Sequence, residues 1–308
     1  MKRIVIILTF FLLGTRLYAQ TLLSPETIKE MRQYVVQGRV VTDYSTLYYE
    51  ELGDGDPVIL IHDHSLSNLM WEQQFYALSQ NYRMIRYDLR GYGESSPQIE
   101  YIHFTHAEDL IALMNALNLD KAHLIGLGMG GSIATDVLAM YPERVSSAVL
   151  VSGNIEKIPG PSQPLLPAGS SKKDLKVVKQ KETDKDKIRQ KRLNEILKTA
   201  GSQREKIREP LDAMIRAWDV WQVFHKEARM LGGLDTCEML KEKRPQIPVL
   251  IVEGKAKGNT RSDTTEILSV LPLGKFILLE DCGRLLNMEQ PEAFNRLVLD
   301  FIVSTAPL

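Results

Sequence analysis

The sequence predicts an α/β protein with a mostly parallel sheet, helices on both faces and a helical insertion. Short apolar runs rich in Val and Ile recur along the chain, helical patterns separate them, and one long segment interrupts the alternation. This rhythm is typical of buried parallel strands joined by crossover helices. With 308 residues and 44% hydrophobic content, the chain is long enough to bury a full core.

The expected elements follow one another from the N-terminus. Ser24 and Pro25 form a favourable cap and first turn for a short helix. Strands are expected at 57–63, 82–88, 122–128, 145–153, 248–254 and 275–281, and helices at 69–80 and 106–117.

Residues 1–19 have the layout of a secretory signal peptide. Lys2 and Arg3 precede an apolar run from Ile4 to Gly14, and a more polar stretch ends at Ala19. The run is shorter than the ~20 residues that a membrane-spanning helix needs. We therefore expect a periplasmic or secreted protein with no membrane span after cleavage; an uncleaved anchor is the alternative.

The alternation breaks at residues 154–238, which we predict to be a helical lid, leaving 20–153 and 239–308 as the core. Within the lid, residues 171–192 carry ten Lys and Arg against four Asp and Glu, although the whole chain has a net charge of -1. Such a run usually forms a solvated helix face, but the segment from Lys172 to Arg192 could also contact an anionic macromolecule. The near-neutral total gives no reason to expect nucleic-acid binding.

Residues 122–134, AHLIGLGMGGSIA, have the pattern of a nucleophile elbow, in which a strand turns sharply into a helix. Small residues two positions before and after the apex, here Gly126 and Gly130, let the backbone close. The apex, where a nucleophile normally stands, is Gly128, which has no side chain to attack a substrate.

A second interpretation of these glycines is a dinucleotide-binding loop, because Gly126, Gly128 and Gly131 match G-x-G-x-x-G. That fingerprint requires an acidic residue after the next strand to bind the ribose. Ser152 and Asn154 flank a glycine there, and the nearest acid, Glu156, comes late. We favour the elbow.

The chain resembles the α/β-hydrolase superfamily over nearly everything from Tyr49 to Ile302. The resemblance rests on YDLRGYGESS at 87–96, GLGMGG at 126–131, YPERV at 141–145, PVLIVEG at 248–254 and CGRLLNMEQPEAFNRLVLDFI at 282–302, in this order. It implies an eight-stranded, mostly parallel sheet. It also implies a nucleophile, an acid and a histidine in that chain order.

All three of these catalytic positions are substituted, which predicts a pseudoenzyme with a degenerate triad. They carry Gly128, Lys257 and Arg284, and an arginine stays protonated and cannot act as a general base. Where the family has a glycine that helps hold the oxyanion, this chain has Asp63, whose carboxylate would repel the developing negative charge.

Polar residues that follow the strands are expected to share one rim of the sheet, where ligands of α/β proteins bind. Besides Gly128 and Asn154, the ligand-binding candidates there are Asp63, His64, Met129, Lys257 and Arg284. Arg284, Lys257 and the helix N-terminus near Met129 suggest a site for a small carboxylate or phosphate. Alternatively, Asp63 simply pairs with Arg284 and fills the old cavity.

Neither a metal nor a cofactor is expected. The pairs His62/His64 and His103/His106 would need a coincidence of folding to converge on a metal. Whether Cys237 and Cys282 form a disulfide stays open, and Cys282 has no activating base beside it.

We therefore expect an exported, non-catalytic protein that binds a small ligand or a macromolecular partner. The alternative is an enzyme using acid/base chemistry by Asp63 or His64, or residual hydrolase activity, in the same pocket. A third possibility is an interaction protein with a vestigial pocket, which makes its contact through the lid.

Overall fold

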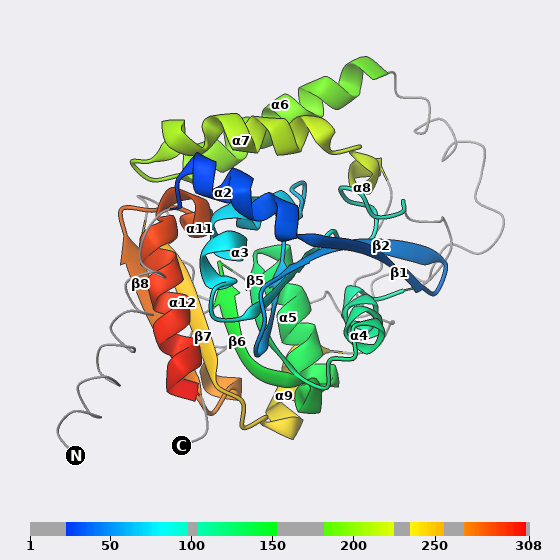
Figure 1. The fold of residues 1–308 in the computed structure, drawn as a ribbon, viewed down its shortest axis with the longest axis vertical. Helices are drawn as coiled ribbons and strands as arrows, with labels where there is room; N and C mark the ends of the chain where they lie inside the picture. Colours follow the sequence, from blue (N-terminus) through cyan, green and yellow to red (C-terminus); the bar gives the residue numbers. More distant parts are fainter. Residues whose placement is uncertain (1–22, 98–103, 153–181, 225–234, 256–267, 306–308) are drawn as a thin grey trace.

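The computed structural model describes residues 23–97, 104–152, 182–224, 235–255 and 268–305. At its centre lies an eight-stranded sheet with the order β1-β2-β4-β3-β5-β6-β7-β8 (Figure 1). Strands β3 to β8 pair in parallel, whereas β2 is antiparallel to both of its neighbours. The predicted fold class is confirmed.

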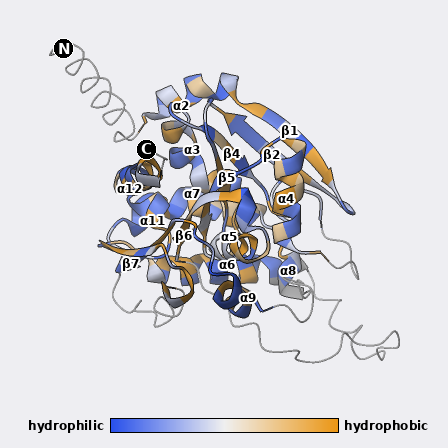
Figure 2. Ribbon diagram, turned by 90° about the horizontal axis from the view of Figure 1, so that it is seen from below, coloured by the Kyte–Doolittle hydropathy of each residue, from blue (hydrophilic) through white to orange (hydrophobic). Residues whose placement is uncertain are grey.

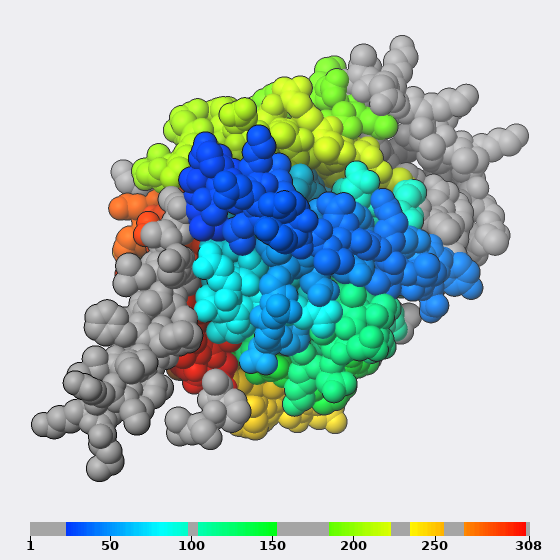
Figure 3. All heavy atoms as spheres, viewed as in Figure 1, coloured from blue at the N-terminus to red at the C-terminus, as the bar shows by residue number. Residues whose placement is uncertain are grey.

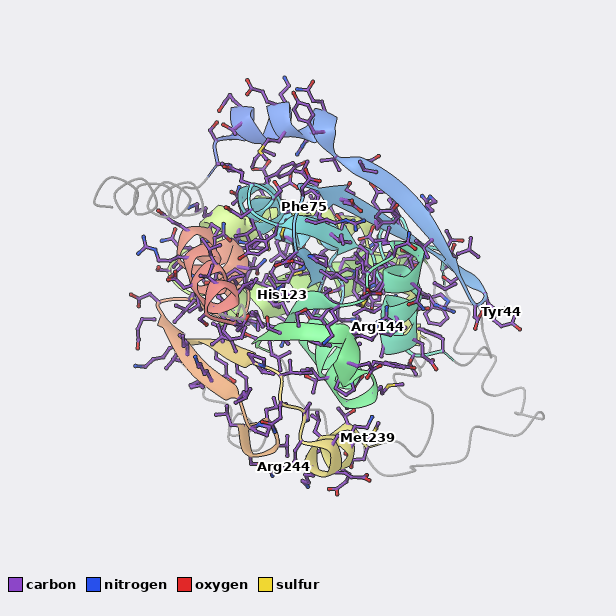
Figure 4. All side chains as sticks on the ribbon, turned by 60° about the horizontal axis from the view of Figure 1, so that its bottom comes forward. Tyr44, Phe75, His123, Arg144, Met239 and Arg244 are labelled. Atoms are coloured by element: carbon purple, nitrogen blue, oxygen red, sulfur yellow. The ribbon has the colours of Figure 1, made fainter. Side chains whose placement is uncertain are left out.

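Six of the eight strands fall on the predicted apolar runs, and the first two form a hairpin that the resemblance alone implied. The strands are β1 Val36–Thr42, β2 Ser45–Leu52, β3 Pro57–Ile61, β4 Arg83–Tyr87, β5 Ala122–Leu127, β6 Val145–Val151, β7 Val249–Lys255 and β8 Gly274–Glu280. Figure 4 shows Tyr44, which is 68% exposed, at the free end of the hairpin.

Helices connect and cover the strands. They are α2 Pro25–Met31, α3 Glu72–Leu78, α4 His106–Ala116, α5 Met129–Met140, α6 Glu182–Thr199, α7 Arg204–Ala217, α8 Trp221–Phe224, α9 Thr236–Lys243, α11 Leu286–Glu289 and α12 Pro291–Thr305, with 3₁₀ turns at Arg32–Tyr34, Asn68–Trp71 and Pro142–Arg144. The predicted first helix is confirmed, and the Ser24 hydroxyl accepts a hydrogen bond from the Thr27 N–H at 3.1 Å. None of the helices within the described ranges is long and apolar enough to cross a membrane.

The core has two layers because successive strand residues point to opposite faces of the sheet. Val58 and Leu60 join the cluster that packs against α3, α12, α6 and α7. Ile59 and Ile61 join the cluster on the other face, with α4, α5 and α9. The helices carry both hydrophilic and hydrophobic residues (Figure 2), as expected for helices with one face on a sheet.

The described part of the predicted lid is helical. Helices α6 and α7 lie against each other above the sheet (Figure 1), and their surface adjoins that of α2 (Figure 3). Helix α9, which begins inside the predicted insertion, packs on α5, where the Thr236 hydroxyl donates to Asp136 Oδ1 at 2.6 Å. Residues 1–22 and 153–181, with the predicted leader and the first half of the basic run, lie outside the described residues.

The turn from β5 into α5 has space only for glycine on both sides of its apex. A Cβ on Gly126 would lie 2.6 Å from the Gly131 nitrogen. One on Gly130 would lie 2.6 Å from the Ile61 carbonyl carbon and 2.8 Å from the His62 oxygen. These neighbours are backbone atoms that cannot move aside cheaply. The sequence interpretation of both glycines is therefore confirmed.

Replacing Gly130 by alanine is expected to destabilise the protein by about 2 kcal/mol, measured by chemical unfolding. Alanine is favoured over glycine inside a helix by about 1 kcal/mol, but overpacking a buried site costs about 1–3 kcal/mol, and more against backbone. A Gly130→Ala variant that is more stable than the wild type would contradict this account of the turn.

Candidate functional site

The site lies at the carboxyl ends of the central strands, where β5 turns into α5. Gly128 is the apex of this turn, with φ 58° and ψ −112°, a conformation that residues with a side chain rarely adopt. Its N–H donates to the Val151 oxygen at 2.8 Å, which joins the apex to the end of β6. The turn thus has the strained geometry of an elbow, with no side chain at its apex.

Asp63, two residues after the end of β3, lies directly over this apex and is 1% exposed. Arg284, from the loop after β8, grips it with two hydrogen bonds of 3.0 Å, from Nε to Oδ2 and from Nη2 to Oδ1. The Met129 N–H, the first of helix α5, donates to Oδ1 at 2.8 Å. One buried carboxylate therefore accepts from an arginine fork and from a helix N-terminus, two groups that favour negative charge.

This ion pair occupies the space that a side chain at position 128 would need. A Cβ on Gly128 would overlap Asp63 Oδ1 and Arg284 Nη2 and would lie 2.5 Å from Asp63 Cγ. The N–H of the residue after the apex is one of the usual oxyanion donors of the fold. Here that donor, Met129, is already bonded to the protein's own carboxylate.

Asp63 stays ionised despite its burial. Burial by itself raises the pKa of a carboxyl group, but here Arg284, the Met129 N–H and Arg192 outweigh burial, so the pKa of Asp63 lies below its usual value. An ionised carboxylate with both oxygens hydrogen-bonded is a weak base. The contacts of Asp63 therefore argue against a role as general base.

Arg192, from the lid helix α6, is a second guanidinium group at this site. Its Nε donates to Ser65 Oγ at 2.8 Å, and its Nη2 lies 3.4 Å from the His64 oxygen. Burial lowers the pKa of Arg192, and the Arg284 charge adds to this effect while Asp63 opposes it. Ser65 holds a positive φ of 66°, so the loop that receives Arg192 is strained.

The two histidines of this loop have different environments. His62 is fully buried; its Nε2 accepts the Leu89 N–H at 3.0 Å, and burial lowers its pKa to about 4, so it is neutral and structural. His64 is half-buried, with Nδ1 2.8 Å from the Tyr92 hydroxyl and its ring 5.2 Å from that of Trp218.

A buried glutamate positions the loop that carries Arg284. Both oxygens of Glu289 accept the Gly283 N–H, at 3.1 and 3.0 Å, and Oε2 also accepts the Gly201 N–H at 2.6 Å. On the opposite side, the Ser152 hydroxyl donates to the Arg284 oxygen at 3.2 Å. The loop is thereby tied both to the turn between α6 and α7 and to the end of β6.

The structure brings together Asp63, Gly128, Met129 and Arg284, as expected for the rim, and His64 lies beside them. Lys257 and Asn154 lie outside the described residues. Asp63 pairs with Arg284, as the second of the two predicted alternatives has it. Arg192 is the last residue of the basic run at 171–192, and no sequence pattern distinguishes it from the other basic residues of that run.

The other candidate chemistries find no support in the described part of the chain. Cys237 and Cys282 are both buried and not disulfide-bonded, and burial raises the pKa of Cys282 to about 12, which leaves it unreactive. No group of three or more potential metal ligands occurs among the described residues. In place of a dinucleotide pyrophosphate, the N-terminus of α5 holds Asp63.

Removing one member of the ion pair is expected to cost more than removing both. Arg284→Met leaves a buried carboxylate uncompensated and should lower the unfolding free energy by about 3 kcal/mol at neutral pH. The double variant Asp63→Leu, Arg284→Met should recover most of this loss, as measured by chemical unfolding. Because the folded pKa of Asp63 is depressed, the stabilisation is present at neutral pH and is lost as the pH falls below about 4. Equal stability of Arg284→Met and the wild type would show that Arg284 does not compensate a buried Asp63 charge.

Comparisons with known proteins agree with this fold. Residues 56–216 match the family model described as the alpha/beta hydrolase fold. The chain is 40% identical to the non-heme chloroperoxidase of Streptomyces lividans over 121 residues, which cover 37% of this chain and 44% of that protein. It is 27% identical to the 2-hydroxy-6-oxo-6-(2'-aminophenyl)hexa-2,4-dienoic acid hydrolase of Metapseudomonas resinovorans over 269 residues, covering 84% and 88% of the two chains.

The relatives with 31–42% identity match over only part of their length, between 23% and 50%. Among solved structures, a thermophilic esterase from Thermogutta terrifontis superimposes with a TM-score of 0.69 at 23% identity, over 88% of this chain and 100% of that one. The matched family model covers the elbow, the Asp63 loop and the first lid helices. The chain therefore belongs to the alpha/beta hydrolase fold family.

Proposed function

We propose that this protein is a non-catalytic member of its family, a pseudoenzyme that binds a small anionic ligand at the rim of the sheet. One observation carries the proposal: the Asp63 carboxylate lies on the Met129 N–H, over the side-chain-free apex at Gly128, and Arg284 holds it there. An ester carbonyl that approached this turn would meet the Asp63 carboxylate. It would find neither a nucleophile nor a free oxyanion donor there.

The charges of the same site support an anionic ligand. Arg284 and Arg192 face one buried carboxylate, Asp63, so these three side chains leave an excess of one positive charge in a half-buried place. The first N–H groups of α5 and its positive dipole end point to the same region. A small anion would balance this charge.

The acid/base alternative would have to rely on His64. Asp63 is engaged through both oxygens, whereas the His64 ring contacts Tyr92 and Trp218 at the edge of the site. Without a nucleophile or a polarising donor, one imidazole supplies only a fraction of the acceleration that hydrolysis requires. Export, through the leader at 1–19, is part of the proposal and rests on the sequence pattern alone.

The proposal is tested with the mature protein on a panel of p-nitrophenyl esters, lactones, amides and epoxides. We expect no turnover by the wild type above an uncatalysed control. The variant Asp63→Gly, Gly128→Ser, Lys257→Asp, Arg284→His should hydrolyse the best ester about 10²-fold faster than the wild type, because it regains a nucleophile, a base and a vacant oxyanion donor.

The matched control is the same variant with Asp63 retained. It should stay inactive, because the serine side chain at position 128 and the Asp63 carboxylate compete for one space. Wild-type turnover that disappears in Asp63→Ala would contradict the non-catalytic assignment, since it would make Asp63 part of a working site.

A further inference from the structure

We infer that Arg192 and Arg284 together form a clamp for an organic monocarboxylate, which binds between the lid helix α6 and the loop after β8. The inference rests on the proposed function and extends it, because it gives the ligand a chemical class and assigns the lid a direct contact with it. Arg192 is the residue that brings the lid into the site.

Both arginines have guanidinium N–H donors that the protein itself does not use. Arg284 uses Nε and Nη2 on Asp63, and Arg192 uses Nε and Nη2 on Ser65 and His64. Among the described residues, nothing accepts a hydrogen bond from Nη1 of either arginine, and neither Nη1 atom is sealed from solvent. Each guanidinium group thus presents a donor edge that the protein leaves unused.

The charge of the clamp selects a monoanion. Two arginines and one ionised aspartate carry a net charge of +1, and Arg192 forms no ion pair within the described part of the chain. The charge of Glu195 also acts on Arg192, but the Glu195 side chain is 49% exposed and lies 3.9 Å from Lys191 on the same helix. A monoanion would neutralise the site, whereas a dianion would leave an unbalanced negative charge in a half-buried place.

The surroundings select an organic acid over an inorganic ion. The backbone oxygen of His64 faces Arg192, and the His64 ring lies 6.0 Å from Tyr92 and 5.2 Å from the buried Trp218. The Tyr92 hydroxyl in turn lies 3.9 Å from Met129 Sδ. Because Tyr92, Trp218 and Met129 are buried, the half-buried His64 ring that packs on Tyr92 and Trp218 is the surface for the organic body of a ligand whose carboxylate lies on the arginines.

The probe for this clamp is hexanoate, titrated by calorimetry and by thermal shift into the wild-type protein. We expect saturable binding of hexanoate, weaker binding of adipate and inorganic phosphate, and none of hexanamide, which has a similar shape without the charge. Arg192→Gln should weaken hexanoate binding at least tenfold. Lys191→Gln is the matched control, because it removes one positive charge from the next position of α6, where the side chain is 78% exposed; it should leave binding unchanged.

Arg192→Lys should bind hexanoate with intermediate affinity, because it keeps the charge and loses the planar fork. The circular dichroism and melting temperature of each variant verify that it is folded. Absence of saturable hexanoate binding to the wild type, equal binding by folded Arg192→Gln, or tighter binding of phosphate would overturn the clamp.

This failure is distinguishable from failure of the proposed function. Hydrolysis of p-nitrophenyl hexanoate by the wild type would refute the non-catalytic assignment, even if hexanoate still bound at Arg192. A protein that neither hydrolyses the ester nor binds the acid would retain that assignment and lose the clamp.

Discussion

The structure of this site depends on one constraint: an ionised carboxylate is buried at the N-terminus of α5. Asp63 is 1% exposed, and an isolated charge at that depth would be prohibitively costly. Arg284 and the Met129 N–H compensate it with three hydrogen bonds. Other features of the rim follow from this need, including the anchoring of the Arg284 loop by Glu289 and Ser152.

The fold supplies these partners from remote parts of the sequence. Asp63 and Arg284 are 221 residues apart in the chain, and they meet because both follow parallel strands whose carboxyl ends share one edge of the sheet. The sharp turn between β5 and α5 places the Met129 N–H at this edge. The turn requires glycine at positions 126 and 130, where neighbouring backbone atoms leave no space for a Cβ. The scaffold typical of an α/β hydrolase therefore holds an internal ion pair where that fold normally places its reacting groups.

Sequence patterns predict most of this arrangement. The alternation of apolar runs with helical patterns identifies six of the eight strands, and Gly126 and Gly130 identify the turn. Both signals are local, because they reflect what the backbone requires within a few residues. Pairing of Asp63 with Arg284 was one of two alternatives, since sequence does not give side-chain distances. The role of Arg192 was not predictable, because a long side chain in a basic run gains significance only from what it meets. Trp218 and Trp221 are three residues apart but do not share a helix, because Trp218 follows the end of α7 and Trp221 begins α8.

The overlap between a side chain at position 128 and the carboxylate at position 63 also bears on how this lineage can evolve. A serine introduced at the apex clashes while Asp63 remains, and a histidine introduced at position 284 leaves Asp63 buried without its strongest cation. Loss of Asp63 first leaves Arg284 without its carboxylate. Each of these single substitutions is therefore disfavoured while the other two positions are unchanged. The effect of a substitution at one of these positions therefore depends on the residues at the other two. Single mutations that change the site are each destabilising, so the present combination tends to persist.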